Sequence, residues 1–227
     1  MQKVLVIASH PDDEVLGCGG TIAHLIAQGD HVTIAILGEG ATSRSERRDQ
    51  ADPAEIEGLR QASRAAAHIL GVQDVRFFGL PDNRFDTMPL LDVVKIIEEL
   101  VREVRPAVVY TQHGGDLNVD HGITFRATMT ATRPMQDGSV RELHAYEVAS
   151  STEWAFAQFE PVFRPNMYVD ISATLELKER ALAAYSGELK EHPHPRSIKG
   201  LRCKAAERGA TSGFSAAEAF QTIWVLR

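Results

Sequence analysis

Residues 4–14 read VLVIASHPDDE, an apolar run that passes directly into a turn carrying one imidazole and three carboxylates. A glycine-rich stretch, residues 17–20, follows the turn. This order is typical of the first strand–helix unit of an open α/β sheet, which binds ligands at the carboxyl ends of its strands. The imidazole and the acids are therefore expected at such an edge, where the neighbouring acids would repel one another unless a cation lay among them.

The rest of the chain alternates short apolar runs with helical patterns, which indicates a mostly parallel sheet covered by helices. Strands are expected at residues 4–8, 31–37, 75–78, 107–111, 144–149, 167–171 and 219–225. Helices are expected at residues 17–28, 53–70, 90–104, 120–132, 174–185 and 198–208. The pattern is most regular up to residue 133, so we expect one domain over residues 1–227, with a core half at 1–133 and a C-terminal elaboration at 134–227.

Composition excludes several classes of protein. The chain has 227 residues, of which 44% are hydrophobic and 24% charged, and these are ordinary values for a globular protein. A net charge of −7 argues against a broad nucleic-acid-binding face. Cys18 and Cys203 form neither a disulfide framework nor a Cys-type zinc motif, so a reducing, cytoplasmic location is expected. The first apolar run is too short for a signal peptide or a membrane span.

A second turn rich in His and Asp follows the strand expected at residues 107–111. Residues 111–121 read TQHGGDLNVDH. In a parallel sheet, both His/Asp turns emerge at the same edge. Adding His121 to His10 and Asp13 gives two imidazoles and one carboxylate, which is the three-ligand pattern of a catalytic zinc with one position open.

Each cluster also has a plainer interpretation. A lone histidine in a loop is more often a hydrogen-bonding residue than a metal ligand. Asp12 or Asp13 could cap the helix that follows them. The glycines at 17, 19 and 20 could cradle a pyrophosphate, but they do not match the G-x-G-x-x-G fingerprint and the acids before them would repel it. From the residues alone, a metal site and a purely structural turn both remain open.

Taken together, the motifs resemble those of the PIG-L/LmbE-like deacetylases, zinc-dependent enzymes that remove N-acetyl groups from glucosamine-type sugars. The specific matches are SHPDDE at residues 9–14, with the glycines behind it, and NVDH at residues 118–121. LPDNRFD at 80–86 also matches, and weaker matches are PHPRS at 193–197 and AEAF at 217–220. The resemblance covers nearly the whole chain and implies a single domain with a Rossmann-like three-layer α/β fold and a mostly parallel sheet.

The resemblance also implies a role for each residue of the two specific motifs. His10, Asp13 and His121 would hold one zinc ion per chain. Asp12 would be the catalytic general base, acting on the water that zinc activates. Asp120 would lie behind the ligands and orient a neighbouring imidazole.

The chain departs from the family at Asn118, where many relatives have a histidine. An asparagine amide can form hydrogen bonds but cannot donate a proton as an acid at neutral pH. The proton for the leaving amine could therefore come from Asp12 after the first step, from His113 or from His194. His194 could reach the site of a neighbouring subunit, because relatives are often oligomeric, and a homo-oligomer is expected.

Several outlying residues are candidate substrate contacts. Arg60 lies on the helix expected after the polar loop, and its plainer interpretation is a solvated helix residue. Asn83 and Arg84 follow the third strand, where Pro-Asp-Asn is also ordinary turn chemistry. Trp154 could stack on a sugar ring or simply belong to a core or an interface. Glu14 is expected to stabilise its loop or to cap the helix that follows.

The function expected from pattern and resemblance is hydrolysis. A zinc-dependent enzyme would remove an N-acetyl group from an amino sugar of the N-acetylglucosamine type, or from a conjugate of it, and release acetate. The partner would be a small-molecule sugar, with no nucleic acid and no membrane span. The alternatives are an amidase for another amide, such as a thiol-sugar conjugate, and a non-catalytic metal- or sugar-binding protein. Asp12 argues against the second alternative, because zinc binding does not require it.

Overall fold

The computed structural model describes residues 1–136 and 138–227. The strands are β1 (Lys3–Ala8), β2 (His31–Gly38), β3 (Asp74–Leu80), β4 (Val108–Gln112), β5 (Glu142–Tyr146), β6 (Met167–Asp170) and β7 (Ala217–Val225). The helices are α1 (Asp13–Ala27), α2 (Pro53–Ile69), α3 (Leu90–Val104), α4 (Val119–Ala131), α5 (Leu175–Ala184) and α6 (Ile198–Ser212). Across the described ranges, no helix is both long enough and apolar enough to cross a membrane.

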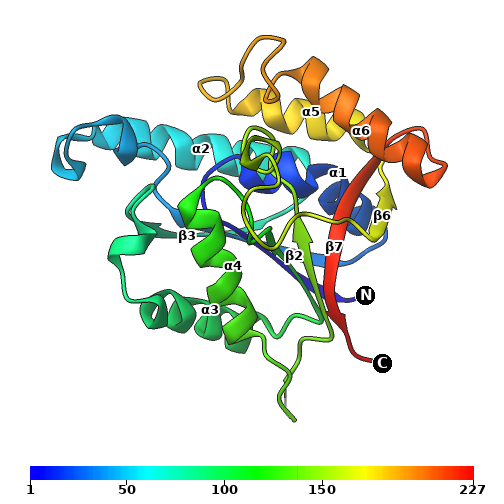
Figure 1. Ribbon diagram of the computed structural model, residues 1–227, viewed down its shortest axis with the longest axis horizontal. Coiled ribbons are helices and arrows are strands. Elements are labelled where there is room, and N and C mark those ends of the chain that lie inside the picture. Colours follow the sequence, from blue (N-terminus) through cyan, green and yellow to red (C-terminus); the bar gives the residue numbers. More distant parts are fainter. Residues whose placement is uncertain (137) are drawn as a thin grey trace.

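The strands form one seven-stranded sheet in the order β3-β2-β1-β4-β5-β7-β6 (Figure 1). The five strands from β3 to β5 are parallel, whereas β7 runs antiparallel to both β5 and β6. The expected α/β fold with a mostly parallel sheet is therefore confirmed. The chain leaves β1 in one direction to form β2 and β3 and then crosses to β4 on the other side. The crevice between the carboxyl ends of β1 and β4 is thus a topological switch point, where such sheets bind ligands.

Helices cover both faces of the sheet and produce three layers. In Figure 1, α3 and α4 lie on one side and α1, α2, α5 and α6 on the other. The central strand β1 is buried on both faces, because Val4, Val6 and Ala8 join the core beneath α1 and α2 while Leu5 and Ile7 join the core beneath α3. This burial explains why β1 reads as a continuous apolar run rather than an alternating one.

Most element boundaries agree with the sequence within a few residues, but the start of the first helix was predicted wrongly. The expected helix begins at residue 17, whereas α1 begins at Asp13. The helix kinks at Cys18, whose φ of −144° and ψ of 22° are not helical. The glycine-rich stretch therefore lies inside a kinked helix, and Asp13 and Glu14 lie in its first turn.

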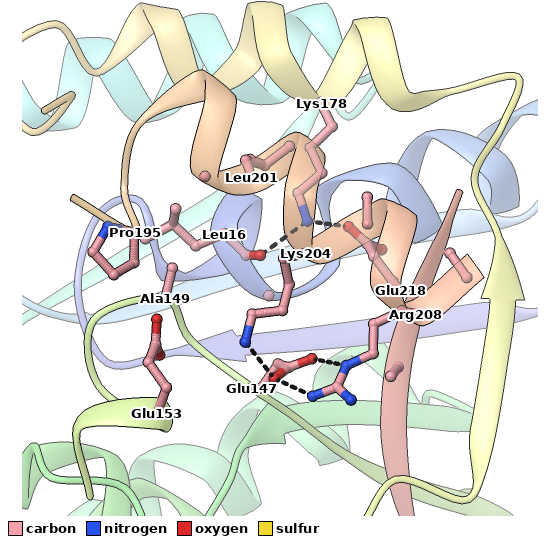
Figure 2. A pocket seen from close by; sticks show the side chains of 15 residues that line it. Leu16, Glu147, Ala149, Glu153, Lys178, Pro195, Leu201, Lys204, Arg208 and Glu218 are labelled. Atoms are coloured by element: carbon pink, nitrogen blue, oxygen red, sulfur yellow. Dashed lines mark hydrogen bonds and ion pairs between the residues drawn. The ribbon is translucent and has the colours of Figure 1, made fainter. Parts of the chain in front are cut away.

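A buried ion pair holds the second half of α1 after the kink. The carboxylate of Glu218 in β7 accepts hydrogen bonds from the backbone N–H groups of Gly20 at 2.9 Å and Thr21 at 2.7 Å. It also accepts one from Nζ of Lys178 in α5 at 2.5 Å. This pair lines a cavity of about 50 Å³ between α1, α6 and β7 (Figure 2). The C-terminal half of the chain thereby fixes the helix that carries Asp13.

Candidate active site

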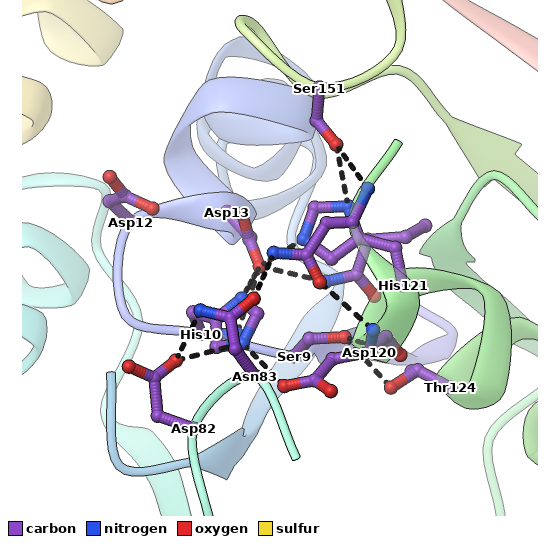
Figure 3. A network of polar contacts seen from close by, with 12 residues as sticks. Ser9, His10, Asp12, Asp13, Asp82, Asn83, Asp120, His121, Thr124 and Ser151 are labelled. Atoms are coloured by element: carbon purple, nitrogen blue, oxygen red, sulfur yellow. Dashed lines mark hydrogen bonds and ion pairs between the residues drawn. The ribbon is translucent and has the colours of Figure 1, made fainter. Parts of the chain in front are cut away.

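Three side chains converge at the switch point of the sheet. His10 follows β1, Asp13 begins α1, and His121 lies in the first turn of α4. Oδ2 of Asp13 is 3.3 Å from Nδ1 of His10 and 3.2 Å from Nε2 of His121 (Figure 3). One possible ligand atom from each residue lies within 4.8 Å of the others. The fold therefore brings together the residues expected to bind metal.

The donor set fits a divalent cation. Oδ2 of Asp13 accepts hydrogen bonds from the His10 backbone N–H and from Nε2 of Gln112, both at 2.9 Å. In contrast, Oδ1 of Asp13 and Nε2 of His121 are buried, and neither has a hydrogen-bond partner in the described part of the chain. Buried polar atoms without partners are costly, so these two atoms favour a ligand.

Each imidazole is held from behind by a carboxylate. Nε2 of His10 contacts Oδ2 of Asp120 at 2.9 Å, and Nδ1 of His121 contacts Oδ2 of Asp116 at 2.8 Å. These contacts leave the other ring nitrogen of each histidine facing Asp13. Asp120 thus contacts one of the two imidazoles, and its role in orienting a metal ligand stays a prediction. Asp116 was missed, although it belongs to the second His/Asp turn, because nothing in the sequence distinguishes it from an ordinary loop acid.

The pKa values of both histidines reflect this acidic setting. Burial lowers the pKa of His10, but hydrogen bonds to Asp120 and Asp13 and the charge of Asp13 outweigh burial and raise the pKa to about 10. Burial likewise lowers the pKa of His121, but the charge of Asp13 and a hydrogen bond to Asp116 raise it to about 9. Excess negative charge therefore surrounds the two rings, as a cation site requires.

Asp12 is buried next to this cluster. Its side chain does not join the contacts among His10, Asp13 and His121 (Figure 3). Its backbone has a φ of 100°, so its side chain leaves the turn in a different direction from that of Asp13. Asp12 occupies the N-cap position of α1, but neither its side chain nor that of Asp13 accepts a capping hydrogen bond there, so the capping interpretation was wrong. Burial raises the pKa of Asp12 to about 7, against the opposing charge of Arg196. Oε2 of Glu14 accepts the backbone N–H of Asp12 at 3.1 Å, so Glu14 stabilises the loop as expected.

Arg196, which lies just before α6, contacts the carboxylate of Asp12. Its Nη1 donates to Oδ2 of Asp12 at 3.0 Å, and its Nε donates to Oγ of Ser150 at 2.8 Å. The sequence analysis noted the surrounding motif but gave Arg196 no role. Sequence reasoning had no means to find this contact, because 184 residues separate the two partners.

Comparison with known proteins places these motifs in a family. The family model for PIG-L, described as GlcNAc-PI de-N-acetylase, matches residues 5–132. The chain belongs to this family. A probable N-acetyl-alpha-D-glucosaminyl L-malate deacetylase 2 from Bacillus cereus is 28% identical over 82% of this chain and 84% of its own length. A diacetylchitobiose deacetylase from Thermococcus kodakarensis is 25% identical over 98% of this chain and 84% of its own length.

Solved structures also share the PIG-L fold of this chain. The N,N'-diacetylchitobiose deacetylase from Pyrococcus horikoshii aligns with a TM-score of 0.76 and 22% identity over 98% of this chain and 84% of that one. GalB from Pseudomonas putida, a 4-carboxy-2-hydroxymuconate hydratase, aligns with a TM-score of 0.78 and 22% identity over 99% of this chain and 97% of that one. Both matches support the three-layer fold. Because a hydratase shares it, the fold alone does not determine the reaction.

Asn118, which the resemblance marks as a departure from the family pattern, forms two side-chain hydrogen bonds within the site. Its Oδ1 accepts the backbone N–H of Asp120 at 2.9 Å and so caps α4. Its Nδ2 donates to Oδ1 of Asn83 at 2.8 Å. Asn83, an expected substrate contact, therefore belongs to the network around the site. Both amide groups thus take part in hydrogen bonds, and a role for either residue in catalysis or substrate binding stays a prediction.

The two histidines considered as alternative acids lie in different places. His113 is buried, and its ring packs edge-on against Phe163 with centroids 5.1 Å apart. None of its contacts in the described residues reaches the cluster, and burial lowers its pKa. His194 lies beside Arg196, whose backbone N–H donates to its Nδ1 at 3.1 Å. Its ring packs edge-on against Trp154 at 5.3 Å, so two residues expected near the substrate are in contact with each other.

The other expected contacts lie further out. The guanidinium of Arg60 lies 5.8 Å from the ring centre of Phe77 in β3, a position that suits packing on the sheet edge. Arg84 is exposed, and its backbone precedes the short 3-10 helix Phe85–Thr87. Neither side chain contacts the metal-binding cluster within the described ranges. A role for either in substrate binding stays a prediction.

Proposed function

We propose that this protein is a zinc-dependent hydrolase that removes the N-acetyl group from an amino sugar of the N-acetylglucosamine type, or from a conjugate of it. One observation carries the proposal. A carboxylate that is not part of the ligand set, Asp12, is buried next to a three-residue metal-binding cluster and is held by Arg196. A protein that only bound metal would gain nothing from such a costly buried group. Membership of the PIG-L family and the deacetylases among its relatives support the same reaction.

His10, Asp13 and His121 would hold the ion, one per chain, with Nδ1 of His10, Oδ1 of Asp13 and Nε2 of His121 as the ligand atoms. The two nitrogens face Asp13, and two of the three atoms are buried without partners, which supports this assignment. When bound there, zinc would act as a Lewis acid toward both water and the acetyl carbonyl.

Asp12 would move the proton. Arg196 occupies its Oδ2, whereas no hydrogen bond to its Oδ1 is found among the described residues. Oδ1 would accept a proton from the attacking water and then return it to the nitrogen of the leaving amine. One residue would thus serve as both base and acid. Two observations support this double role: Asn118 cannot donate a proton, and the ring of His113 packs against Phe163.

The test is acetate release from a panel of N-acetylated sugars, nucleotide sugars and sugar thiols. At least one N-acetylglucosamine derivative should be hydrolysed by the zinc-loaded protein. Asp12→Asn should retain zinc, because Asp12 is not a ligand, but lose about 10²- to 10⁴-fold in turnover. Asp92→Asn, which changes an exposed aspartate of α3, is the matched control and should retain full turnover.

The outcomes separate the alternatives. Near-normal turnover by Asp12→Asn would exclude Asp12 as the base. Zinc binding without acetate release from any substrate would favour the non-catalytic binding protein. Preference for a sugar thiol conjugate over N-acetylglucosamine derivatives would favour the other amidase. Zinc content is measured in the purified parent protein and in the His10→Ala variant. Less than about a tenth of an equivalent in both would exclude the metal site itself.

A further inference from the structure

His10 contacts a second carboxylate that the resemblance does not assign. Oδ1 of Asp82, in the loop after β3, lies 3.2 Å from Nε2 of His10 (Figure 3). The same nitrogen contacts Oδ2 of Asp120 at 2.9 Å, on a different element of the fold. Two acceptors that approach one ring N–H from two separate segments restrict rotation of the ring more than either alone.

Asp82 is itself held in place. Its Oδ2 accepts hydrogen bonds from the backbone N–H of Ser43, at 3.1 Å, and from the Ser43 hydroxyl. Its Oδ1 accepts one from Nδ2 of Asn83 at 3.2 Å, and its own N–H donates to Oγ1 of Thr42 at 3.3 Å. These bonds attach the polar loop that contains Ser43 to the side chain that contacts His10.

The burial of Asp82 needs an explanation. Its residue surface is 2% exposed, and a buried carboxylate is costly unless a positive group compensates for it. In residues 1–136 and 138–227, the only ion-pair partner of Asp82 is His10. The network is therefore arranged so that the carboxylate acts on that imidazole.

The three contacting groups could in principle hold a metal of their own. The relevant atoms of His10, Asp82 and Asp120 lie within 4.8 Å of one another. However, every carboxylate oxygen of the two aspartates accepts a hydrogen bond or contacts the imidazole, and Oδ1 of Asp120 accepts the backbone N–H of Phe85 at 2.9 Å. Oδ1 of Asp13 and Nε2 of His121, in the other cluster, are buried without partners, whereas no side-chain atom of His10, Asp82 or Asp120 is in that condition in the described ranges. The geometry therefore favours an orienting role for this set over a second metal site.

We propose that Asp82 is a positioning residue that, with Asp120, holds the His10 ring by Nε2 and keeps Nδ1 directed toward the metal. This inference rests on the proposed metal site. Removal of such a carboxylate behind a metal-binding histidine typically weakens metal affinity about 10- to 100-fold. Through Ser43, the polar loop becomes part of the support for a metal ligand.

The test is the zinc dissociation constant of Asp82→Asn, measured by competition with a chromophoric chelator. An increase of about 10- to 100-fold is expected. The absorption spectrum of the Co²⁺-substituted protein should change as well, because this spectrum reports the geometry of the metal ligands. If Asp82 only stabilised the fold, its substitution would leave that geometry unaltered. Asp86→Asn, which alters an exposed aspartate a few residues along the same loop, is the matched control and should match the parent protein. Ser43→Ala keeps the carboxylate but removes the hydroxyl that donates to its Oδ2, and it should weaken zinc binding in the same direction.

Circular dichroism of the metal-free variants would establish that they are folded. If Asp82→Asn fails to fold, the zinc affinity of Ser43→Ala tests the positioning role of Asp82 instead. Unchanged zinc affinity and Co²⁺ spectrum in a folded Asp82→Asn would overturn this proposal and leave the deacetylase proposal intact. Two equivalents of zinc in the parent protein, with one lost in Asp82→Asn, would overturn it in favour of a second metal site. No zinc binding by the parent protein would overturn both proposals.

Discussion

The backbone conformation at Asp12 predicts that a glycine substitution there is less destabilising than an alanine substitution, the reverse of the usual order. With a φ of 100° and a ψ of −26°, Asp12 adopts a left-handed conformation that is costly for any residue with a Cβ atom. The penalty is about 1–2 kcal/mol for a residue other than glycine. Against this, glycine gains about 0.4–1 kcal/mol of entropy in the unfolded chain relative to alanine. Asp12→Gly should therefore be more stable than Asp12→Ala by about 1 kcal/mol, the balance of these opposing effects.

The comparison of two variants removes other contributions. Both lack the carboxylate, so the loss of the Arg196 contact and of the buried charge cancels in the difference. Gln61, exposed in α2, provides the matched control pair. At that helical position the glycine variant should be less stable than the alanine variant by about 1 kcal/mol. The glycine-minus-alanine difference in stability should therefore have opposite signs at the two sites and differ between them by about 2 kcal/mol.

The assay is urea unfolding of the metal-free proteins, followed by circular dichroism. A difference of 1 kcal/mol corresponds to a shift of about 2–4 °C in Tm for a domain of this size, so thermal scans provide an independent check. If Asp12→Gly were no more stable than Asp12→Ala, the backbone at this position would not be strained. The conformation that separates the side chains of Asp12 and Asp13 would then need another explanation.

Three further predictions concern packing, the buried ion pair and the metal. Gly17→Ala would place a Cβ 2.1 Å from the ring of Tyr146, and such overpacking should lower the free energy of unfolding by about 1–3 kcal/mol in urea titrations; an unchanged midpoint would contradict it. Glu218→Gln removes the charged partner of the buried Lys178 and should lower the free energy of unfolding by about 3–5 kcal/mol in the same titrations. A decrease below about 1 kcal/mol would mean that water reaches the ammonium group. Chelation should lower Tm, because zinc at 100 times its Kd stabilises the folded state by about 2.7 kcal/mol; equal Tm values with and without chelator would count against the metal site.

Regular patterns made much of the fold predictable. The bounds of α3 agree with the sequence because its apolar residues recur at helical spacing along one face. The start of α1 was misjudged because a glycine-rich run ordinarily ends or precedes a helix, whereas here Glu218 compensates for the kink through a contact from β7. No local signal reveals such support from a distant strand.

The residues of the candidate metal site could be expected to lie together for a related reason. His10, Asp13 and His121 lie within two short motifs that follow strands, so the parallel sheet alone brings them to one edge. Arg196 and Asp82, to which no local pattern assigns a role, reach the site through tertiary contacts instead. Arg196 contacts Asp12 from beyond α5, and Asp82 contacts His10 from the far side of β2. Their side-chain types are common in loops, and only the folded structure distinguishes them.

The contact between Glu218 and α1 sets the order in which the molecule can be completed during synthesis. The family motifs within residues 5–132 leave the ribosome first, yet 198 residues separate Gly20 from the carboxylate that holds its backbone N–H. Until β5 and β7 emerge, β4 presents an unpaired edge that can capture other strands. The nascent chain therefore carries the motifs of the candidate metal site through a period in which they are exposed but not yet fixed. A chaperone that shields this edge would protect the half of the protein that contains the chemistry.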